Sequence, residues 1–365
     1  MVNNTVAKFS IEYYQYLNAQ GELINPTEKL PAWAQDFATL QEAYRMMVLT
    51  RAFDNKAIAL QRTGKLGTYP SSLGQEAVYI GIGNALEKQD VFCPSYRDWG
   101  TQLIRGVTMG EILTYWGGSE RGSDFQASTA KEDLPNCIPI GSQCLHAAGI
   151  ATAIKLRQQS RAALVTCGDG GTSQGDFYET INISGVWQLH LVIMIVNNQW
   201  AISVPRKSQT AAETLAQKAI AGGIPGEQVD GNDLIAVQDR VSRALKKAHE
   251  GGGPTVIEAI TYRLSDHTTA DDASRYRKKD ELAEAWQNDP ITRLRQYLFL
   301  HQAWSENEEK QLQQICSEQV AKAVDAYQQQ PLESPENIFL HQYATMPTSL
   351  ATQRDEFLAK QQQQG

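Results

Sequence analysis

Two short apolar runs in the middle of the chain constrain its fold more than any other feature. They are Ala162–Cys167 and Leu191–Val196, and the second reads LVIMIV without a polar residue. Strands without polar alternation are typical of parallel sheets that helices cover on both faces. Helical patterns at about 176–189 and 234–249 alternate with these runs and with a further strand at 256–262. This order predicts a doubly wound α/β domain with a mainly parallel sheet, whose ligands bind at the carboxyl ends of the strands.

The remaining sequence predicts extensions on both sides of this domain. Residues 1–35 form a polar N-terminal arm, and the α/β domain is expected to span 36–300. Residues 301–365 are expected to form a C-terminal helical extension and tail, with a long surface helix at 305–330. The Gln-rich end of the tail is expected to have no fixed structure.

Composition excludes several classes of protein. The chain of 365 residues has 33 Lys and Arg against 41 Asp and Glu, a net charge of -8, so we expect no nucleic-acid partner. No apolar run approaches the roughly 20 residues that span a bilayer, and the N-terminus lacks the pattern of a secretory signal. The five cysteines are odd in number and form no CxxC pair, which favours reduced thiols in the cytoplasm.

A glycine-rich segment, CGDGGTSQGD from Cys167 to Asp176, directly follows the first apolar strand. Glycines let the backbone approach a phosphate, and the free N–H groups of a helix start can donate to it. Asp169, at the strand end, could hold a cation that bridges the phosphate. A plain glycine-rich turn explains this segment equally well on its own. A Walker A loop does not, because Asp176 stands where that motif requires a lysine.

An Asn pair at the end of the next strand adds to this pattern. Asn198 lies 29 positions after Asp169, and adjacent parallel strands would bring both residues to one edge of the sheet. Carboxylate and amide oxygens suit magnesium, which usually completes its octahedron with phosphates and water. A GDG segment followed at this spacing by an Asn pair is the thiamine diphosphate signature.

From about Arg51 to Arg277 the chain resembles the alpha subunit of the decarboxylase component of 2-oxo acid dehydrogenase complexes. It is most similar to the pyruvate dehydrogenase (acetyl-transferring) type of Gram-positive bacteria. Six segments carry the resemblance: TRAFDNKAIALQRTGKLGTYPSSLGQEA, PSYRDWG, IPIGSQCLHAAG, GDGGTSQGDFYE, VNNQWAISVPRKSQTAAETLAQKA and TYRLSDHTTADDASRYR.

The resemblance implies a role for each matching residue at the metal end of the cofactor. Asp169 and Asn198 match the magnesium ligands, and the backbone carbonyl of Trp200 completes the protein's share of that set. Gly170 and Gly171 match the backbone donors to the diphosphate.

Other matching residues are implied to contact the thiamine diphosphate itself. Tyr96 and Arg97 match a pair that grips the phosphates, a task suited to the forked donors of arginine. Ile140 matches the apolar wedge that bends the cofactor, and Ile138 matches a backbone contact to its aminopyrimidine. His267 matches the catalytic-loop histidine that touches the diphosphate and lines the channel for the lipoyl arm.

The chain supplies half of such an active site. Thiamine catalysis needs a carboxylate at N1′ of the pyrimidine, and the resemblance assigns that glutamate to a beta subunit. It therefore implies an α2β2 heterotetramer that passes its acyl group to a lipoyl-bearing acyltransferase core. A branched-chain 2-oxo acid or acetoin dehydrogenase stays open as an alternative. A magnesium-dependent hydrolase or kinase and a non-catalytic subunit agree less well with the Asn pair and with intact Asp169, Asn198, Arg97 and His267.

Some positions depart from relatives or permit two interpretations. Val196 stands where branched-chain enzymes often carry Arg, and Asp266 stands where many relatives carry another His. Thr268 occupies the place of a regulatory serine in mitochondrial relatives, but nothing in the sequence indicates a kinase. Arg263 either neutralises phosphate or holds the loop that follows it. His146 is interpreted as a packing residue on a buried helix.

The segment Leu264–Arg277, LSDHTTADDASRYR, carries too few apolar residues to bury itself. We expect it to be mobile without a ligand and to become ordered when the cofactor binds.

Overall fold

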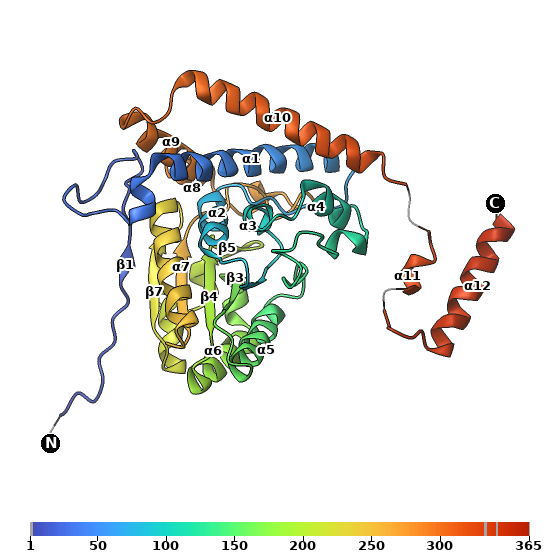
Figure 1. Cartoon of the computed structure of the whole chain (residues 1–365), viewed down its shortest axis with the longest axis horizontal. Coiled ribbons are helices and arrows are strands. Elements are labelled where there is room, and N and C mark those ends of the chain that lie inside the picture. The colour runs from blue at the N-terminus through green and yellow to red at the C-terminus, as the bar shows by residue number, and fades with distance from the viewer. Residues whose placement is uncertain (1–2, 332–333, 341, 365) are drawn as a thin grey trace.

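A six-stranded sheet with helices on both faces forms the centre of the computed structural model, which describes residues 3–331, 334–340 and 342–364 (Figure 1). Each neighbouring pair of strands in this sheet is parallel, which confirms the predicted α/β fold. Across the sheet the strands are β1 Tyr13–Tyr14, β7 Gly226–Asp230, β8 Thr255–Ile260, β4 Leu191–Asn197, β3 Ala163–Gly168 and β2 Val91–Cys93. A two-stranded hairpin, β5 Trp200–Ala201 and β6 Val204–Pro205, follows β4.

Alternate residues of the central strands face opposite layers of helices. Ile193 packs in a core with α5 Ser142–Leu156 and α6 Gly175–Trp187. Its neighbour Met194 packs in a second core with α2 Glu76–Ala85 and α7 Leu234–His249 on the other face. This two-sided burial explains why β4 has no polar side chain before Asn197.

Further helices cover one end of the sheet. Figure 1 shows α1 Phe37–Arg62 and α10 Glu306–Gln328 side by side there, and contacts between them agree. The remaining α-helices of the α/β body and of the long C-terminal segment are α1 Phe37–Arg62, α2 Glu76–Ala85, α3 Trp99–Ile104, α4 Met109–Trp116, α8 Lys279–Trp286, α9 Pro290–Leu300 and α10 Glu306–Gln328. The short 3-10 helices are η1 Ala32–Gln35, η2 Glu120–Ser123, η3 Gly170–Ser173, η4 Arg206–Ser208, η5 Ala216–Gly222 and η6 Ala273–Arg275.

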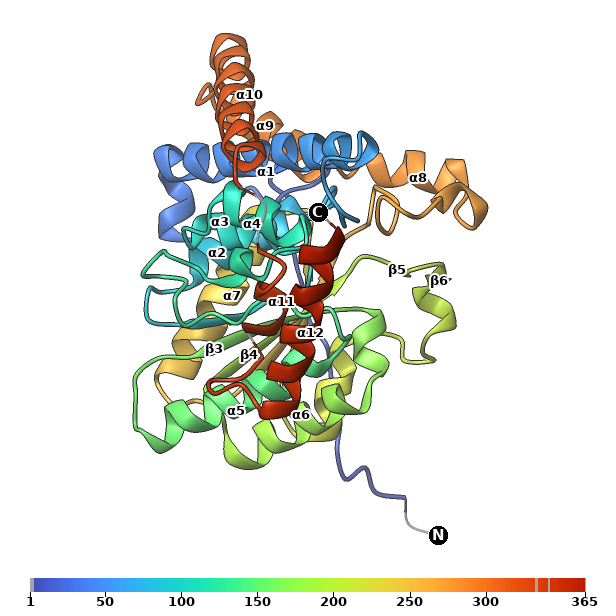
Figure 2. The same ribbon diagram turned by 90° about the vertical axis from the view of Figure 1, so that its right-hand side faces the viewer.

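The C-terminal helices α11 Asn337–Leu340 and α12 Thr348–Gln364 stand apart from the α/β body on one side (Figure 1, Figure 2). Helix α12 continues to Gln364, so the structure differs from the expected unstructured Gln-rich end. Gln, Lys, Leu and Ala are good helix formers, which accounts for the difference. No helix of the part of the chain described above is long and apolar enough to cross a membrane.

Candidate functional site

A cavity of about 440 Å³ opens at the carboxyl ends of β3 and β4. These strands pair in parallel with Gly168 opposite Val196, so the residues that follow each strand lie at the same edge of the sheet. Asp169 and Asn198 line the cavity from these two positions. The predicted proximity of the GDG segment and the Asn pair is confirmed by this register.

All residues that the resemblance assigned to the cofactor and its metal line this one cavity. They are Tyr96, Arg97, Ile138, Ile140, Asp169, Gly170, Gly171, Asn198, Trp200 and His267. Segments separated by up to 171 positions of sequence therefore meet at one place. The roles of the individual residues stay predictions, because the cavity shows only where the side chains lie.

The glycine-rich turn leaves no room for side chains at Gly170 and Gly171. A Cβ atom on Gly170 would lie 2.6 Å from Cβ of Ala201, and one on Gly171 would lie 2.5 Å from Sγ of Cys167. The turn itself is the 3-10 helix η3, and α6 begins only at Gly175. The backbone of η3, rather than the start of α6, therefore faces the cavity.

Asp169 is a buried carboxylate with few partners. Its side chain is 3% exposed, and its Oδ2 accepts a hydrogen bond from Nε2 of Gln209 at 3.0 Å. Burial raises the pKa of Asp169, and the bond from Gln209 opposes this rise only in part. A cation at this carboxylate would offset the cost of burying its charge. Gln209 lies in a segment that carries the family resemblance, but the sequence analysis assigned it no role.

Arg97 supports His267 from one side. Its Nη2 lies 2.8 Å from Nδ1 of His267 and donates to the carbonyl oxygen of the same residue at 2.6 Å. A guanidinium only donates, so Nδ1 accepts and the imidazole proton resides on Nε2. Burial, together with the positive charges of Arg97 and Arg263, lowers the pKa of His267 to about 3. His267 is therefore a neutral donor through Nε2.

Arg263 holds the loops around the cavity. It is fully buried and donates to the carbonyl oxygens of Trp200 at 3.1 Å and Ile202 at 2.8 Å, and to the hydroxyl of Tyr276. Burial, followed by the charge of Arg97, lowers the pKa of Arg263. These contacts favour the loop-holding interpretation of Arg263. The carbonyl of Trp200, a predicted metal ligand, keeps a second lone pair for a cation.

Polar contacts organise the loop 264–277. Arg277 donates to the carbonyl oxygens of Arg263, Leu264 and Ser265, and Oδ2 of Asp271 accepts from the backbone N–H of His267 at 2.9 Å. Asp266, the departure from relatives with paired histidines, accepts from the N–H of Ala273 at 2.9 Å. Its carboxylate therefore serves the loop internally. These static contacts do not test the predicted mobility of the loop.

One interpretation from the sequence is wrong. His146 is exposed on α5, because the buried face of this helix consists of Cys144, Ala147, Ala148 and Ala151. His146 points away from that face and does not pack in the core. Small residues lie on both sides of α5, so the sequence did not show which side faces the sheet.

Comparisons with known proteins agree with this geometry. Residues 44–336 match the family model described as "Dehydrogenase E1 component". The chain belongs to the dehydrogenase E1 component family. It is 43% identical to a protein of Acholeplasma laidlawii over 87% of this chain and 92% of the relative. It is 38% identical to one of Staphylococcus aureus over 99% of this chain and 96% of the relative. Both relatives are named "Pyruvate dehydrogenase E1 component subunit alpha".

Membership of the E1 family implies thiamine diphosphate as the cofactor, and the cavity has the chemistry for it. Arg97 lines the cavity, and buried Arg263, which donates to the carbonyl oxygens of the lining residues Trp200 and Ile202, adds a second positive charge behind them. Because Gly170 and Gly171 lack side chains, their backbone can lie in the lining of the cavity, where it can contact a phosphate. The described residues contain no group of three or more His, Cys, Asp or Glu side chains that could hold a metal ion. A metal held by one carboxylate, one amide and one carbonyl needs no such group.

Proposed function

We propose that the chain is the alpha subunit of a pyruvate dehydrogenase (acetyl-transferring). The similarity to proteins named as this subunit, over 87% to 99% of the chain, carries the proposal. The cavity at the ends of β3 and β4, with all ten predicted cofactor residues in its lining, supports it.

Within this proposal, Asp169, Asn198 and the carbonyl of Trp200 hold Mg²⁺, and the backbone at Gly170 and Gly171 donates to the diphosphate. Bound thiamine diphosphate supplies an electron-accepting ring on which a 2-oxo acid can lose CO2. Tyr96 and Arg97 are assigned to the phosphates. Ile138 and Ile140 are about half exposed at the cavity and are assigned to the thiamine rings.

His267 is proposed to serve the transfer step. Its Nε2–H can donate to a diphosphate oxygen, because Arg97 occupies Nδ1. Its loop lies at the cavity, with Thr268 also in the lining, where a lipoyl arm has to enter. A neutral imidazole can donate there without adding a third positive charge beside Arg97 and Arg263.

A beta subunit is proposed to complete the site in an α2β2 heterotetramer. Asp169 is the one carboxylate among the described residues that line the cavity, so the chain offers none for N1′ of the pyrimidine. A lipoyl-bearing acyltransferase core then receives the acetyl group. The five cysteines are free thiols, which supports a cytoplasmic location.

Substrate turnover tests the proposal. The chain would be co-expressed with its beta subunit and assayed with pyruvate, 2-oxoisovalerate and acetoin, with a lipoyl domain as acceptor. We expect the highest kcat/KM with pyruvate. A higher value with 2-oxoisovalerate or acetoin would replace pyruvate as the substrate while retaining the E1 assignment.

A further inference from the structure

The amide of Asn198 is oriented by one strong contact. Its Nδ2 donates to Oε1 of Gln75 at 3.1 Å, and its Oδ1 accepts from the backbone N–H of Trp200 at the longer distance of 3.4 Å. Asn198 is only 7% exposed, and Gln75 is the one side chain of the described residues to which its nitrogen donates. Gln75 therefore decides which end of the amide faces the cavity, and it leaves the oxygen for a cation.

Gln75 itself has little freedom. It is fully buried at the start of α2, where its backbone N–H donates to the carbonyl of Ser72 at 2.9 Å. Its Oε1 also accepts from the hydroxyl of Tyr79 at 3.3 Å. Its Nε2 has no hydrogen-bond partner among the described residues, so the buried amide of Gln75 is only partly satisfied. Burying an unsatisfied amide nitrogen costs stability, so we expect this glutamine to have a role toward another residue.

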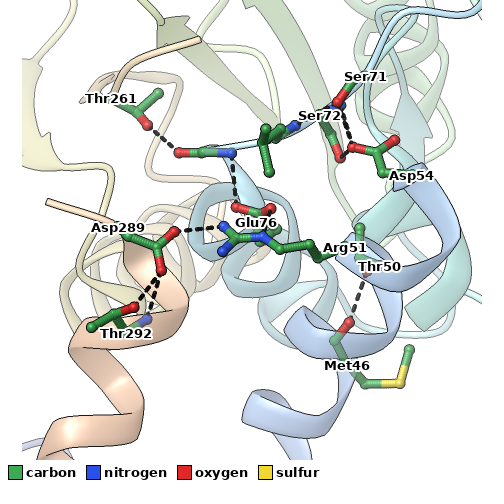
Figure 3. Close-up of polar contacts among 12 residues, drawn as sticks. Met46, Thr50, Arg51, Asp54, Ser71, Ser72, Glu76, Thr261, Asp289 and Thr292 are labelled. Atoms are coloured by element: carbon green, nitrogen blue, oxygen red, sulfur yellow. Dashed lines mark hydrogen bonds and ion pairs between the residues drawn. The ribbon is translucent and has the colours of Figure 1, made fainter. Parts of the chain in front are cut away.

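A buried polar frame fixes the segment that carries Gln75 (Figure 3). Asp54, fully buried on α1, accepts from the hydroxyls of Ser71 and Ser72 at 2.9 Å each and from the N–H of Ser72 at 2.7 Å. On the other side, the hydroxyl of Thr261 donates to the carbonyl of Gly74 at 2.7 Å. Gly74 has a φ of +91° and lies against the backbone of the residues that follow β8. A Cβ atom on Gly74 would be 2.5 Å from the carbonyl oxygen of Tyr262.

Two linked ion pairs hold Glu76, the residue that follows Gln75. Glu76 is fully buried, accepts from Nε of Arg51 at 2.8 Å and accepts from the N–H of Gly74 at 3.0 Å. Arg51 also donates to Asp289 at 2.7 Å, which caps α9. Figure 3 shows Arg51 reaching from α1 between Glu76 and Asp289. Gln75 therefore stands between two anchored residues, Gly74 and Glu76.

We propose that Gln75 is a positioning residue for the magnesium site, acting through Asn198. The inference rests on the proposed function, because it assumes that Asn198 is a metal ligand. Mg²⁺ demands nearly ideal octahedral geometry, so a ligand oxygen that can rotate away weakens binding. Residues that orient metal ligands change metal affinity by roughly 10- to 100-fold when they are replaced.

The test measures how thiamine diphosphate binding depends on Mg²⁺ in the α2β2 complex, by calorimetry at several Mg²⁺ concentrations. Gln75→Leu removes the acceptor, whereas Gln75→Glu keeps an acceptor oxygen in the same place. Gln238→Leu is the matched control, because buried Gln238 of α7 likewise accepts from an asparagine amide, Nδ2 of exposed Asn84 at 3.3 Å, at the C-terminal end of α2. Asp169→Ala tests the metal assignment itself.

We expect Gln75→Leu to raise the Mg²⁺ concentration for half-maximal cofactor binding by roughly 10- to 100-fold. Saturating Mg²⁺ should restore most of the cofactor affinity, which a general defect in folding would not allow. Gln75→Glu and Gln238→Leu should stay near the wild type. If Gln75→Leu does not fold, Gln75→Asn, which withdraws the acceptor by one methylene, takes its place.

A Gln75→Leu complex with unchanged Mg²⁺ dependence, or a Gln75→Glu complex as weak as Gln75→Leu, would overturn the role of Gln75. If Asp169→Ala also bound the cofactor with normal Mg²⁺ dependence, the metal site itself would be wrong. If Asp169→Ala loses Mg²⁺-dependent binding while Gln75→Leu behaves like the wild type, only the inference about Gln75 is rejected and the metal site stands.

Discussion

Nη2 of Arg97 lies 2.8 Å from Nδ1 of His267 and 2.6 Å from the carbonyl oxygen of the same residue. The contact joins the segment after β2 to the loop after β8, which are 170 positions apart. It fixes both the tautomer of the imidazole and the place of its backbone. The histidine therefore faces the cavity as a neutral donor.

Replacing Arg97 by Met should weaken cofactor binding in the α2β2 complex. The change removes the bonds to His267 and the bond to the carbonyl of Ser71 at 2.8 Å. Within the proposed function Arg97 also donates to the diphosphate, and one hydrogen bond of a charged group contributes about 1.5–3 kcal/mol, which corresponds to roughly 10- to 100-fold in affinity. Calorimetric titration with thiamine diphosphate measures the change. An unchanged affinity would mean that Arg97 is dispensable for the site.

The pKa of His267 gives a pH dependence of stability with a definite sign. Burial and the neighbouring arginines lower this pKa to about 3, against 6.5 for an ordinary histidine. Between these values the unfolded chain binds a proton that the folded chain does not bind. Keeping His267 neutral in the folded protein therefore costs no stability above about pH 6.5. As the pH falls from 6.5 toward 3, it progressively lowers the free energy of unfolding.

His267→Gln, which cannot ionise, should consequently lose less thermal stability than the wild type between about pH 7 and pH 5. Thermal unfolding of the cofactor-free protein across this range measures the difference. Parallel pH profiles for the two proteins would show that His267 is not held neutral in the folded state.

Loop 264–277 should become protected when the cofactor binds. Its own contacts are polar and partly exposed, and ordering costs about 1–2 kcal/mol per residue, so the diphosphate is needed to complete its order. Limited proteolysis of the apo complex should cut within 264–277 quickly and should slow when thiamine diphosphate and Mg²⁺ are added. Equal cleavage rates in both states would remove the proposed ordering.

His267→Ala should lose most of this protection and most acetyl transfer to a lipoyl domain. Decarboxylation with an artificial electron acceptor should remain measurable, because His267 is not assigned to that step. Normal lipoyl acetylation by this variant would exclude the proposed role of the histidine.

The purified alpha chain alone should release no CO2 from pyruvate or 2-oxoisovalerate, even at saturating cofactor. The physical reason is the missing N1′ carboxylate, since Asp169 is the one carboxylate in the described lining and is assigned to the metal. Addition of the beta subunit should restore turnover. Steady CO2 release from the alpha chain alone would contradict the proposal that this chain carries only half of the active site.

The sequence predicted the strongly patterned elements best. Helix α7 has the predicted limits 234–249, because Asp233 caps its start and glycines follow its end. Strands β1 and β7 were not predicted. β1 has only two residues, and β7 reads GEQVD, in which Gln228 faces Glu258 instead of an apolar layer. Such strands become visible only when their partner in the sheet is known.

The cavity residues were accessible from the sequence because they follow a family motif. Gln75 and Gln209 were not, because each acts on a motif residue through one side-chain contact made by folding. Gln75 lies 123 positions from Asn198, and no spacing rule connects them. Both glutamines lie in segments that carry the family resemblance, but the segments do not tell which motif residue each glutamine contacts.

Calorimetric titration of thiamine diphosphate into the α2β2 complex carrying Asp169→Ala, with and without Mg²⁺, tests the central claim most directly. Asp176→Ala, in the same glycine-rich segment but without an assigned ligand role, is the control. We predict that the Asp169 variant folds and assembles but shows no Mg²⁺-dependent binding, whereas the Asp176 variant binds normally. Wild-type, Mg²⁺-dependent affinity in the folded Asp169→Ala complex would contradict the account.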